Sequence, residues 1–217
     1  RFMTHSISPW TASGMKDNNA RFESRVRSFL EHIVEDKPRH ALFLNMLAML
    51  EHLGSRKIML SQMDRVMTQD TLQHLAEEAR HAYFFKRNAE RVAGKALDGW
   101  SDENTMSRLP AAMYFGRLDA GITRVVGEEA AYGWVSLIIE LRACWLYAIY
   151  QEVLEQSSDH MSLKSLLAEE DHHLAEMFDM CGEDYDTLKS LSAHETELFE
   201  KLWGRLEEEL VANREAA

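Results

Sequence analysis

Two short segments of closely similar sequence carry the residues that are best suited to metal chemistry. Residues 75–82 read Leu-Ala-Glu-Glu-Ala-Arg-His-Ala, and residues 167–173 read Leu-Ala-Glu-Glu-Asp-His-His. Residues three apart lie on one face of an α-helix, so Glu78 and His81 can present a carboxylate and an imidazole to the same point. The second segment offers a Glu and a His at the same spacing. The repeat therefore predicts two metal-binding positions.

Two isolated acidic residues precede these segments. Glu51 and Glu140 each lie in a stretch that is apolar on nearly every side, where an uncompensated carboxylate is costly to bury. Glu51 precedes Glu78 by 27 residues, and Glu140 precedes Glu170 by 30. Two helical hairpins of similar size would bring all four acids to one level of a bundle. The candidate metal ligands are Glu51, Glu78, His81, Glu140, Glu170 and His173.

This set of ligands favours particular metals. Carboxylates and imidazoles suit iron or manganese, whereas two isolated cysteines, Cys144 and Cys181, cannot form a thiolate zinc site. Four carboxylates also cancel the charge of two divalent cations, which removes the cost of burying Glu51 and Glu140. We therefore expect two metal ions, which could be iron, manganese or one of each.

The sequence leaves three alternatives open. Glu169 and His172 form a competing pair at the same spacing in the second segment. Glu51 could pair with Arg56 or Lys57 at a helix edge instead of binding metal. The whole set could also be a solvated Glu and His face on an ordinary helical bundle.

Three further residues near the candidate ligands could take part in chemistry. Tyr147 follows Glu140 by about two helical turns, where it could be a redox-active or proton-donating phenol, or a buried tyrosine with a satisfied hydroxyl. His52 and His74 could orient metal ligands. As isolated histidines, however, they are expected at helix edges or beside ordinary partners.

Helical periodicity extends along most of the chain, and no stretch is typical of a strand. We expect one all-α domain over residues 1–217, with a core bundle at about 38–182 and amphipathic helices added at about 19–36 and 187–213. Residues 1–17 show no periodicity and are expected to form an irregular arm.

Local signals predict two helix boundaries within the core. Asp70 and Gln73 resemble a capping box that would begin the helix of the first motif. Gly116, Gly121 and Gly127 interrupt the apolar pattern and predict a kink or several short helices between the two halves of the bundle.

Composition and charge exclude several functions. The net charge of -12 opposes binding to a phosphate backbone, and no basic stripe offsets it, so no nucleic-acid partner is expected. The apolar run at 134–150 contains Glu140 and Arg142, which predicts burial in protein rather than a membrane span. Few cysteines and no signal-peptide core predict a cytoplasmic protein.

The ligand pattern resembles the ferritin-like di-iron carboxylate proteins. Residues 77–81, Glu-Glu-Ala-Arg-His, are similar to the Asp/Glu-Glu-x-Arg-His motif of their oxygenase branch, which includes the multicomponent monooxygenases. The order and spacing of the six candidate ligands are also similar to those of aldehyde-deformylating oxygenases. The resemblance covers about residues 40–180 and implies a ferritin-like four-helix bundle with additional N- and C-terminal helices.

The same resemblance implies roles for flanking residues and an activity. Glu77 and Glu169 would orient the ligating histidines across the bundle, Arg80 would lie beside them, and His172 stands where the family pattern has a second Arg. The implied protein is a non-haem di-iron oxidoreductase. It would use dioxygen to oxidise a small, partly apolar organic substrate, with electrons from an external donor.

Other functions are compatible with a similar ligand pattern. A ferroxidase, a storage subunit or a rubrerythrin-like peroxidase would handle iron, although two isolated cysteines cannot build the Cys-x-x-Cys module of a rubrerythrin. Leu166 stands where aminoarene N-oxygenases carry an additional His, which disfavours that activity. A metal-free helical interaction module is a further alternative. A homodimer is compatible with the sequence.

Overall fold

The computed structural model describes residues 7–65 and 67–215, and these residues form α-helices and connections without any strand. The all-α prediction is therefore confirmed for the described part of the chain. Residues 1–6 of the expected irregular arm lie outside it. The helices are α1 (Pro9–Ser13), α2 (Met15–Asn19), α3 (Glu23–Glu35), α4 (Lys37–Gln62), α5 (Gln69–Ala93), α6 (Arg108–Val126), α7 (Glu128–Glu155), α8 (Lys164–Cys181) and α9 (Tyr185–Glu215).

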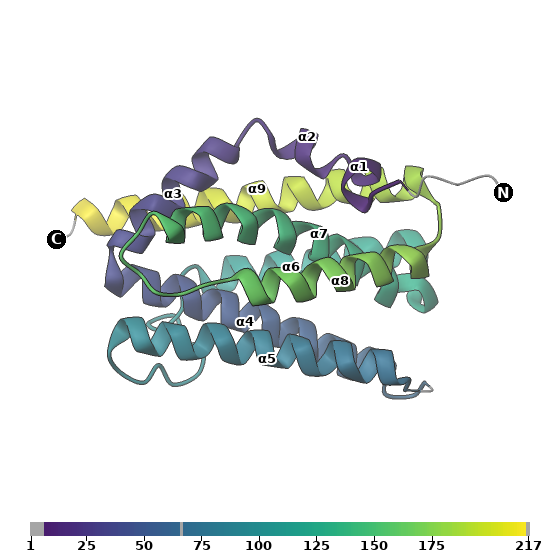
Figure 1. Ribbon diagram of the computed structural model, residues 1–217, viewed down its shortest axis with the longest axis horizontal. Coiled ribbons are helices and arrows are strands. Elements are labelled where there is room, and N and C mark those ends of the chain that lie inside the picture. The colour runs from purple at the N-terminus through teal and green to yellow at the C-terminus, as the bar shows by residue number, and fades with distance from the viewer. Residues whose placement is uncertain (1–6, 66, 216–217) are drawn as a thin grey trace.

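Two long helical hairpins form the centre of the molecule. Helix α4 packs along α5, and α7 packs along α8, with α5 and α8 also in contact (Figure 1). Helix α6 lies against α4, α7 and α9, while α9 and the N-terminal helices cover the side of the bundle away from α5. The four helices α4, α5, α7 and α8 carry all the acidic and histidine residues that the repeat singled out.

Helix α7 is the central helix of the core. Its sequence is long and apolar enough to cross a membrane, with a mean hydropathy of 1.2 over its best window, but 72% of that window is buried within the protein. Burial against other helices is the environment that such a sequence finds in a folded core. The structure agrees with the prediction for residues 134–150.

Capping residues explain where the hairpin helices begin and end. The Asp36 side chain accepts a hydrogen bond from the backbone N–H of Arg39 at the start of α4. The start of α5 differs from the prediction, because Thr68 rather than Asp70 caps it, with Thr68 Oγ1 3.1 Å from the backbone nitrogen of Thr71. Gly94 ends α5 at a φ of 68°, which glycine adopts without strain.

The glycine-rich segment between the hairpins forms one regular helix, which corrects the prediction of a kink or short helices there. Helix α6 continues without interruption through Gly116 and Gly121. It ends at Val126, and the following residue, Gly127, has a φ of 82°. A β-carbon added to Gly121 would lie 2.6 Å from Nε2 of His194 on α9. Gly121 therefore allows α6 and α9 to approach closely, a role that sequence periodicity cannot distinguish from helix breaking.

The N-terminal region also differs from the prediction. Residues 9–13 and 15–19 are short helices rather than an irregular arm, and they pack against α9. The added helices are observed at Glu23–Glu35 and Tyr185–Glu215, close to their expected positions. Helix α9 buries the leucines expected from its periodicity: Leu191, Leu198, Leu202, Leu206 and Leu210.

Candidate metal centre

The six candidate ligands converge inside the bundle from all four hairpin helices. None of them is more than 8% exposed. Two groups of buried side chains each offer ligand atoms that lie within 4.8 Å of one another, and Glu78 belongs to both groups. One group is Glu51, Glu78, His81 and Glu170; the other is His74, Glu78, Glu140 and His173.

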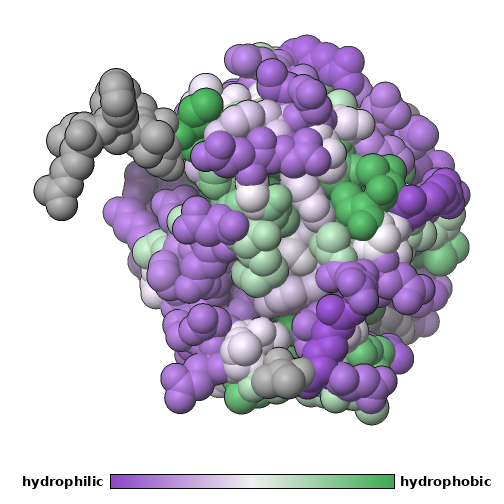
Figure 2. Space-filling model, turned by 90° about the vertical axis from the view of Figure 1, so that its right-hand side faces the viewer, coloured by the Kyte–Doolittle hydropathy of each residue, from purple (hydrophilic) through white to green (hydrophobic). Residues whose placement is uncertain are grey.

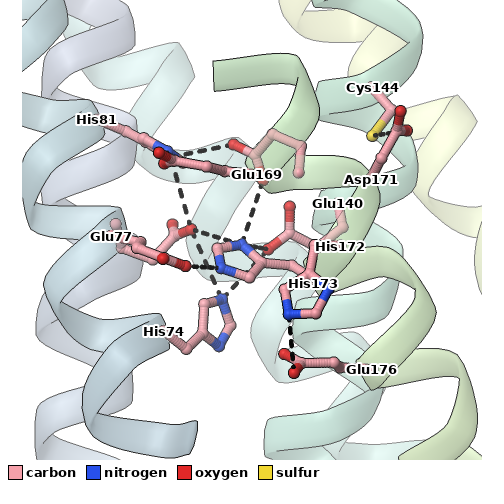
Figure 3. A network of polar contacts seen from close by, with 12 residues as sticks. His74, Glu77, His81, Glu140, Cys144, Glu169, Asp171, His172, His173 and Glu176 are labelled. Carbon is pink, nitrogen blue, oxygen red and sulfur yellow. Dashed lines mark hydrogen bonds and ion pairs between the residues drawn. The ribbon is translucent and has the colours of Figure 1, made fainter. Parts of the chain in front are cut away.

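The two motif histidines are held in reciprocal fashion across the bundle. Nε2 of His81 on α5 lies 2.7 Å from Oε2 of Glu169 on α8, and Nε2 of His173 on α8 hydrogen-bonds Oε2 of Glu77 on α5 (Figure 3). Each ring therefore directs Nδ1 towards the carboxylates at the centre. A carboxylate on the outer nitrogen is the arrangement that fixes the tautomer and angle of a metal-binding histidine.

Several atoms at the centre lack the hydrogen bonds that buried polar groups normally make. Glu78 Oε1, His81 Nδ1, Glu170 Oε2 and His173 Nδ1 are all buried without a hydrogen-bond partner. Such atoms are costly unless another group satisfies them. Their convergence on one region, with oxygen and nitrogen donors in the set, is suited to binding metal ions.

The flanking residues of the second motif show which of its two Glu and His pairs faces inwards. His172 is 62% exposed at its side chain and lies 3.2 Å from Glu176 on the same helix, pointing away from the cluster (Figure 3). Glu169 instead reaches His81, while Arg80 Nη2 lies 2.7 Å from Glu169 Oε1. The structure thus places Glu170 and His173, not Glu169 and His172, at the centre.

Burial and charge together set the protonation of this cluster. Burial alone would lower the pKa of His81, but Glu170, Glu51 and Glu78 raise it to about 10. Glu140 and Glu170 similarly raise the pKa of His173 to about 11 against the effect of burial. Without metal the cluster therefore retains imidazolium protons as counter-charges, and bound metal ions would replace those protons.

The carboxylates divide by environment. Burial, followed by the charges of Glu78 and Glu170, raises the pKa of Glu51 well above its usual value. Burial and the charge of Glu140 raise the pKa of Glu170. Burial would also raise the pKa of Glu140, but hydrogen bonds from its neighbours lower it overall. Their surroundings thus disfavour the anionic forms of Glu51 and Glu170 until a cation balances them.

Glu51 does not make the surface ion pair that was its alternative explanation. Lys57 Nζ lies 2.8 Å from Oδ2 of Asp119 on α6. Glu51 instead faces the interior, where the hydroxyl of Tyr147 donates a hydrogen bond to its Oε1. Burial and the charge of Glu51 keep the pKa of Tyr147 well above its usual value, so the phenol stays protonated.

His74 is a member of the buried cluster, which corrects the expectation that it lies at a helix edge or beside an ordinary partner. Its Nε2 lies 3.2 Å from Glu140 Oε1, and its Nδ1 lies 2.8 Å from the hydroxyl of Tyr132. A usable signal was present, because His74 lies one helical turn before Glu78 and so on the same face of α5. His52, in contrast, is exposed and stacks on Trp100 at the edge of the bundle, as expected.

Two cavities reach the cluster from different sides. The first, of about 290 Å³, runs from His74, Glu78 and Glu140 to a rim that includes Arg65 and Glu128. Figure 2 shows the end of the molecule where α4 and α6 finish, with hydrophilic residues around a smaller apolar area. The second, of about 80 Å³, is largely apolar and borders the four carboxylates and Tyr147. Its apolar lining includes Leu50, Leu146, Phe199, Leu202 and Trp203.

No family model, curated protein or solved structure matches the chain. The function must therefore be inferred from the chemistry of the site. The described residues form an all-helical structure with buried His and Glu clusters that are able to hold metal ions and are compatible with a di-iron site.

Proposed function

We propose that the protein is a non-haem di-iron oxidoreductase of the ferritin-like type, which uses dioxygen to oxidise a small organic substrate. The observation that carries this proposal is the pair of buried ligand groups that share Glu78, with inward-facing Nδ1 atoms and unsatisfied carboxylate oxygens. Glu51, Glu140, Glu170, His81 and His173 would complete the ligand set. Two irons bound there would supply electrons and open coordination positions for dioxygen.

The protein's own residues would prepare the site in three ways. Glu77 and Glu169 hold the histidine rings, and Arg80 holds Glu169. Apolar residues of α4, α7 and α9 line the inner cavity, and a substrate bound there would displace water and so strengthen electrostatic interactions. We propose Tyr147 as a proton donor at this cavity, because its protonated hydroxyl already donates to Glu51.

The lining of the inner cavity favours a substrate that has an apolar part. Its volume of about 80 Å³ has room for several water-sized groups, and its wall is mainly aliphatic and aromatic. It borders the four carboxylates, so a molecule bound there would lie next to the proposed metal ions. The wider cavity beside His74 would admit dioxygen and solvent from the molecular surface. An external electron donor would be needed to return the irons to the ferrous state.

Anaerobic loading with Fe(II), followed by metal analysis and exposure to dioxygen, tests this proposal. We expect about two irons per chain and an optical change on oxidation, after which added reductant and dioxygen support turnover of a small apolar probe. The Glu140→Ala and His173→Ala variants should lose metal, whereas His172→Ala should retain it. A chain that binds no iron would contradict the proposal. A 24-subunit assembly that mineralises iron would replace it with iron storage.

A further inference from the structure

We propose that His74 is a third imidazole ligand, so that the two metal positions differ in their ligands. The inference rests on the two-metal centre proposed above. One position would be bound by His74, His173 and Glu140, the other by His81, Glu51 and Glu170, and Glu78 would be shared between them.

The position and burial of the His74 ring are those of a ligand. Its side chain is 3% exposed, and Nε2 lies 3.2 Å from Glu140 Oε1 and 3.6 Å from Glu78 Oε1. Nδ1 of His173 approaches the same oxygen of Glu140 at 3.4 Å. The two rings have centroids 4.4 Å apart and come from different helices, α5 and α8. Two imidazole nitrogens therefore converge on one edge of Glu140 (Figure 3).

The opposite nitrogen of His74 has its own fixed partner. Nδ1 lies 2.8 Å from the hydroxyl of Tyr132 on α7. If Nε2 binds metal, Nδ1 carries the ring proton and donates a hydrogen bond to the hydroxyl oxygen of Tyr132. Tyr132 would thus orient the ring of His74, as Glu169 and Glu77 orient the rings of the other two histidines. Tyr132 differs from them because it is neutral and contacts Nδ1, which leaves Nε2 of His74 to bind metal. His81 and His173 would bind through Nδ1.

The competing explanation is that His74 remains an imidazolium and only donates a hydrogen bond to Glu140. The two explanations predict different numbers of metal-bound rings. A ligand loses the proton from its binding nitrogen and keeps one N–H on the other. The proposal thus predicts three metal-bound imidazoles, each with one exchangeable ring N–H, whereas the imidazolium explanation predicts two.

Cobalt(II) is a suitable probe, because it replaces iron at carboxylate and imidazole ligands and strongly shifts the proton NMR signals of bound rings. The full chain, freed of metal, is titrated with Co(II) without oxygen. We expect two Co(II) per chain and three shifted signals that disappear in D2O. His74→Ala should weaken one of the two Co(II) sites at least tenfold and leave the other unchanged.

Two further variants control this measurement. Tyr132→Phe removes only the partner of Nδ1, and it should keep three signals while weakening one Co(II) site by about 10- to 100-fold. His172→Ala removes an exposed histidine of α8 and should match the wild type. Far-UV circular dichroism checks that each variant is folded. If His74→Ala fails to fold, the wild-type signal count and Tyr132→Phe still decide the assignment.

The possible failures are distinguishable. Two bound Co(II) ions with only two exchangeable shifted signals would overturn the assignment of His74 and leave the two-metal centre intact. Unchanged Co(II) affinity in His74→Ala would do the same. If the wild-type chain binds no Co(II) and no Fe(II), the two-metal centre itself is wrong, and the His74 assignment falls with it.

Discussion

At the scale of single residues, hydrogen bonds on the outer nitrogens orient the two candidate histidine ligands, His81 and His173. His81 is fixed by Glu169 on the facing helix, and Glu169 is in turn held by Arg80. The chain thereby settles the direction of the ring before any metal binds. An imidazole without such a partner would have to be ordered by the metal, at a cost in binding free energy.

We therefore predict that Glu169→Leu weakens binding of one metal ion by about 10- to 100-fold while the protein stays folded. The reason is that the ring of His81 loses the acceptor for its Nε2 proton. Metal titration monitored by calorimetry gives the affinity. Glu176→Gln is the matched control, because it alters a carboxylate of the same helix whose partner, His172, points away from the cluster. Equal losses in both variants would contradict the prediction.

The residues of the site differ in how well the sequence predicted them. Helical spacing alone puts Glu78 and His81 on one face, and the repeat selected Glu170 and His173, which the structure brings together with them. The contact between His74 and Tyr132 could not be predicted, because it depends on how closely α5 and α7 approach. The metal-binding role of all these residues stays a prediction.

At the scale of helices, two glycines that look alike in sequence have different surroundings. Gly54 lies where α4 passes α5, and a β-carbon added there would be 3.2 Å from Oε2 of Glu78. An added β-carbon at Gly116 on α6 would meet nothing within 4 Å. The apolar pattern predicted most of the helices, but not the roles of these glycines, because their surroundings come from distant parts of the chain.

We predict that alanine at Gly54 weakens metal binding, whereas alanine at Gly116 does not. Gly116→Ala should raise the free energy of unfolding by about 0.5 to 1 kcal/mol, because alanine favours helix and the site is open. Gly54→Ala gains the same helix propensity, but its β-carbon would crowd the carboxylate of Glu78. Because Glu78 is a candidate ligand, this variant should weaken metal binding. Urea denaturation and metal titration of both variants check this. Weakened metal binding in Gly116→Ala would show that the effect does not come from the contact with Glu78.

At the scale of the whole molecule, α9 is joined to the bundle by a buried ion pair. Arg142 of α7 and Glu195 of α9 meet through two contacts of 2.7 Å, and Tyr114 of α6 donates to Glu195 at 2.7 Å. Asn19 of α2 accepts from Arg142 at 2.7 Å. The network connects four helices, including α9, which also lines the apolar cavity beside the candidate metal centre. The added helices α2 and α9 are thus held against α7, which also carries the candidate ligand Glu140.

Glu195→Gln should lower the free energy of unfolding by about 3 to 5 kcal/mol, because it leaves the buried Arg142 without its counter-charge. The double variant Arg142→Met with Glu195→Met should recover much of this loss. Glu208→Gln provides the control, since it removes an exposed pair with Arg205 and should change stability by about 0.5 kcal/mol or less. Urea denaturation gives the free energy of unfolding of each variant. If Glu195→Gln lowers it no more than Glu208→Gln does, the prediction is contradicted.

The buried histidine His40 makes the stability of the whole molecule depend on pH. His40 hydrogen-bonds the hydroxyl of Tyr150, and burial lowers its pKa to about 4, with the charge of Arg91 adding to burial and that of Asp159 opposing it. The folded protein therefore prefers neutral His40, whereas an unfolded histidine takes up a proton near pH 6.5. The stability that His40 contributes is complete above about pH 6.5 and is lost as the pH falls towards 4.

The loss should amount to about 2 kcal/mol between about pH 7.5 and pH 5. Other acidic groups also titrate over this range, so the quantity to measure is the difference in unfolding free energy between wild type and His40→Gln, without metal. That difference should shift by about 2 kcal/mol in favour of the variant as the pH falls. Glutamine keeps a hydrogen-bonding group near Tyr150 but cannot titrate. A difference that stays constant with pH would show that the folded protein accommodates protonated His40.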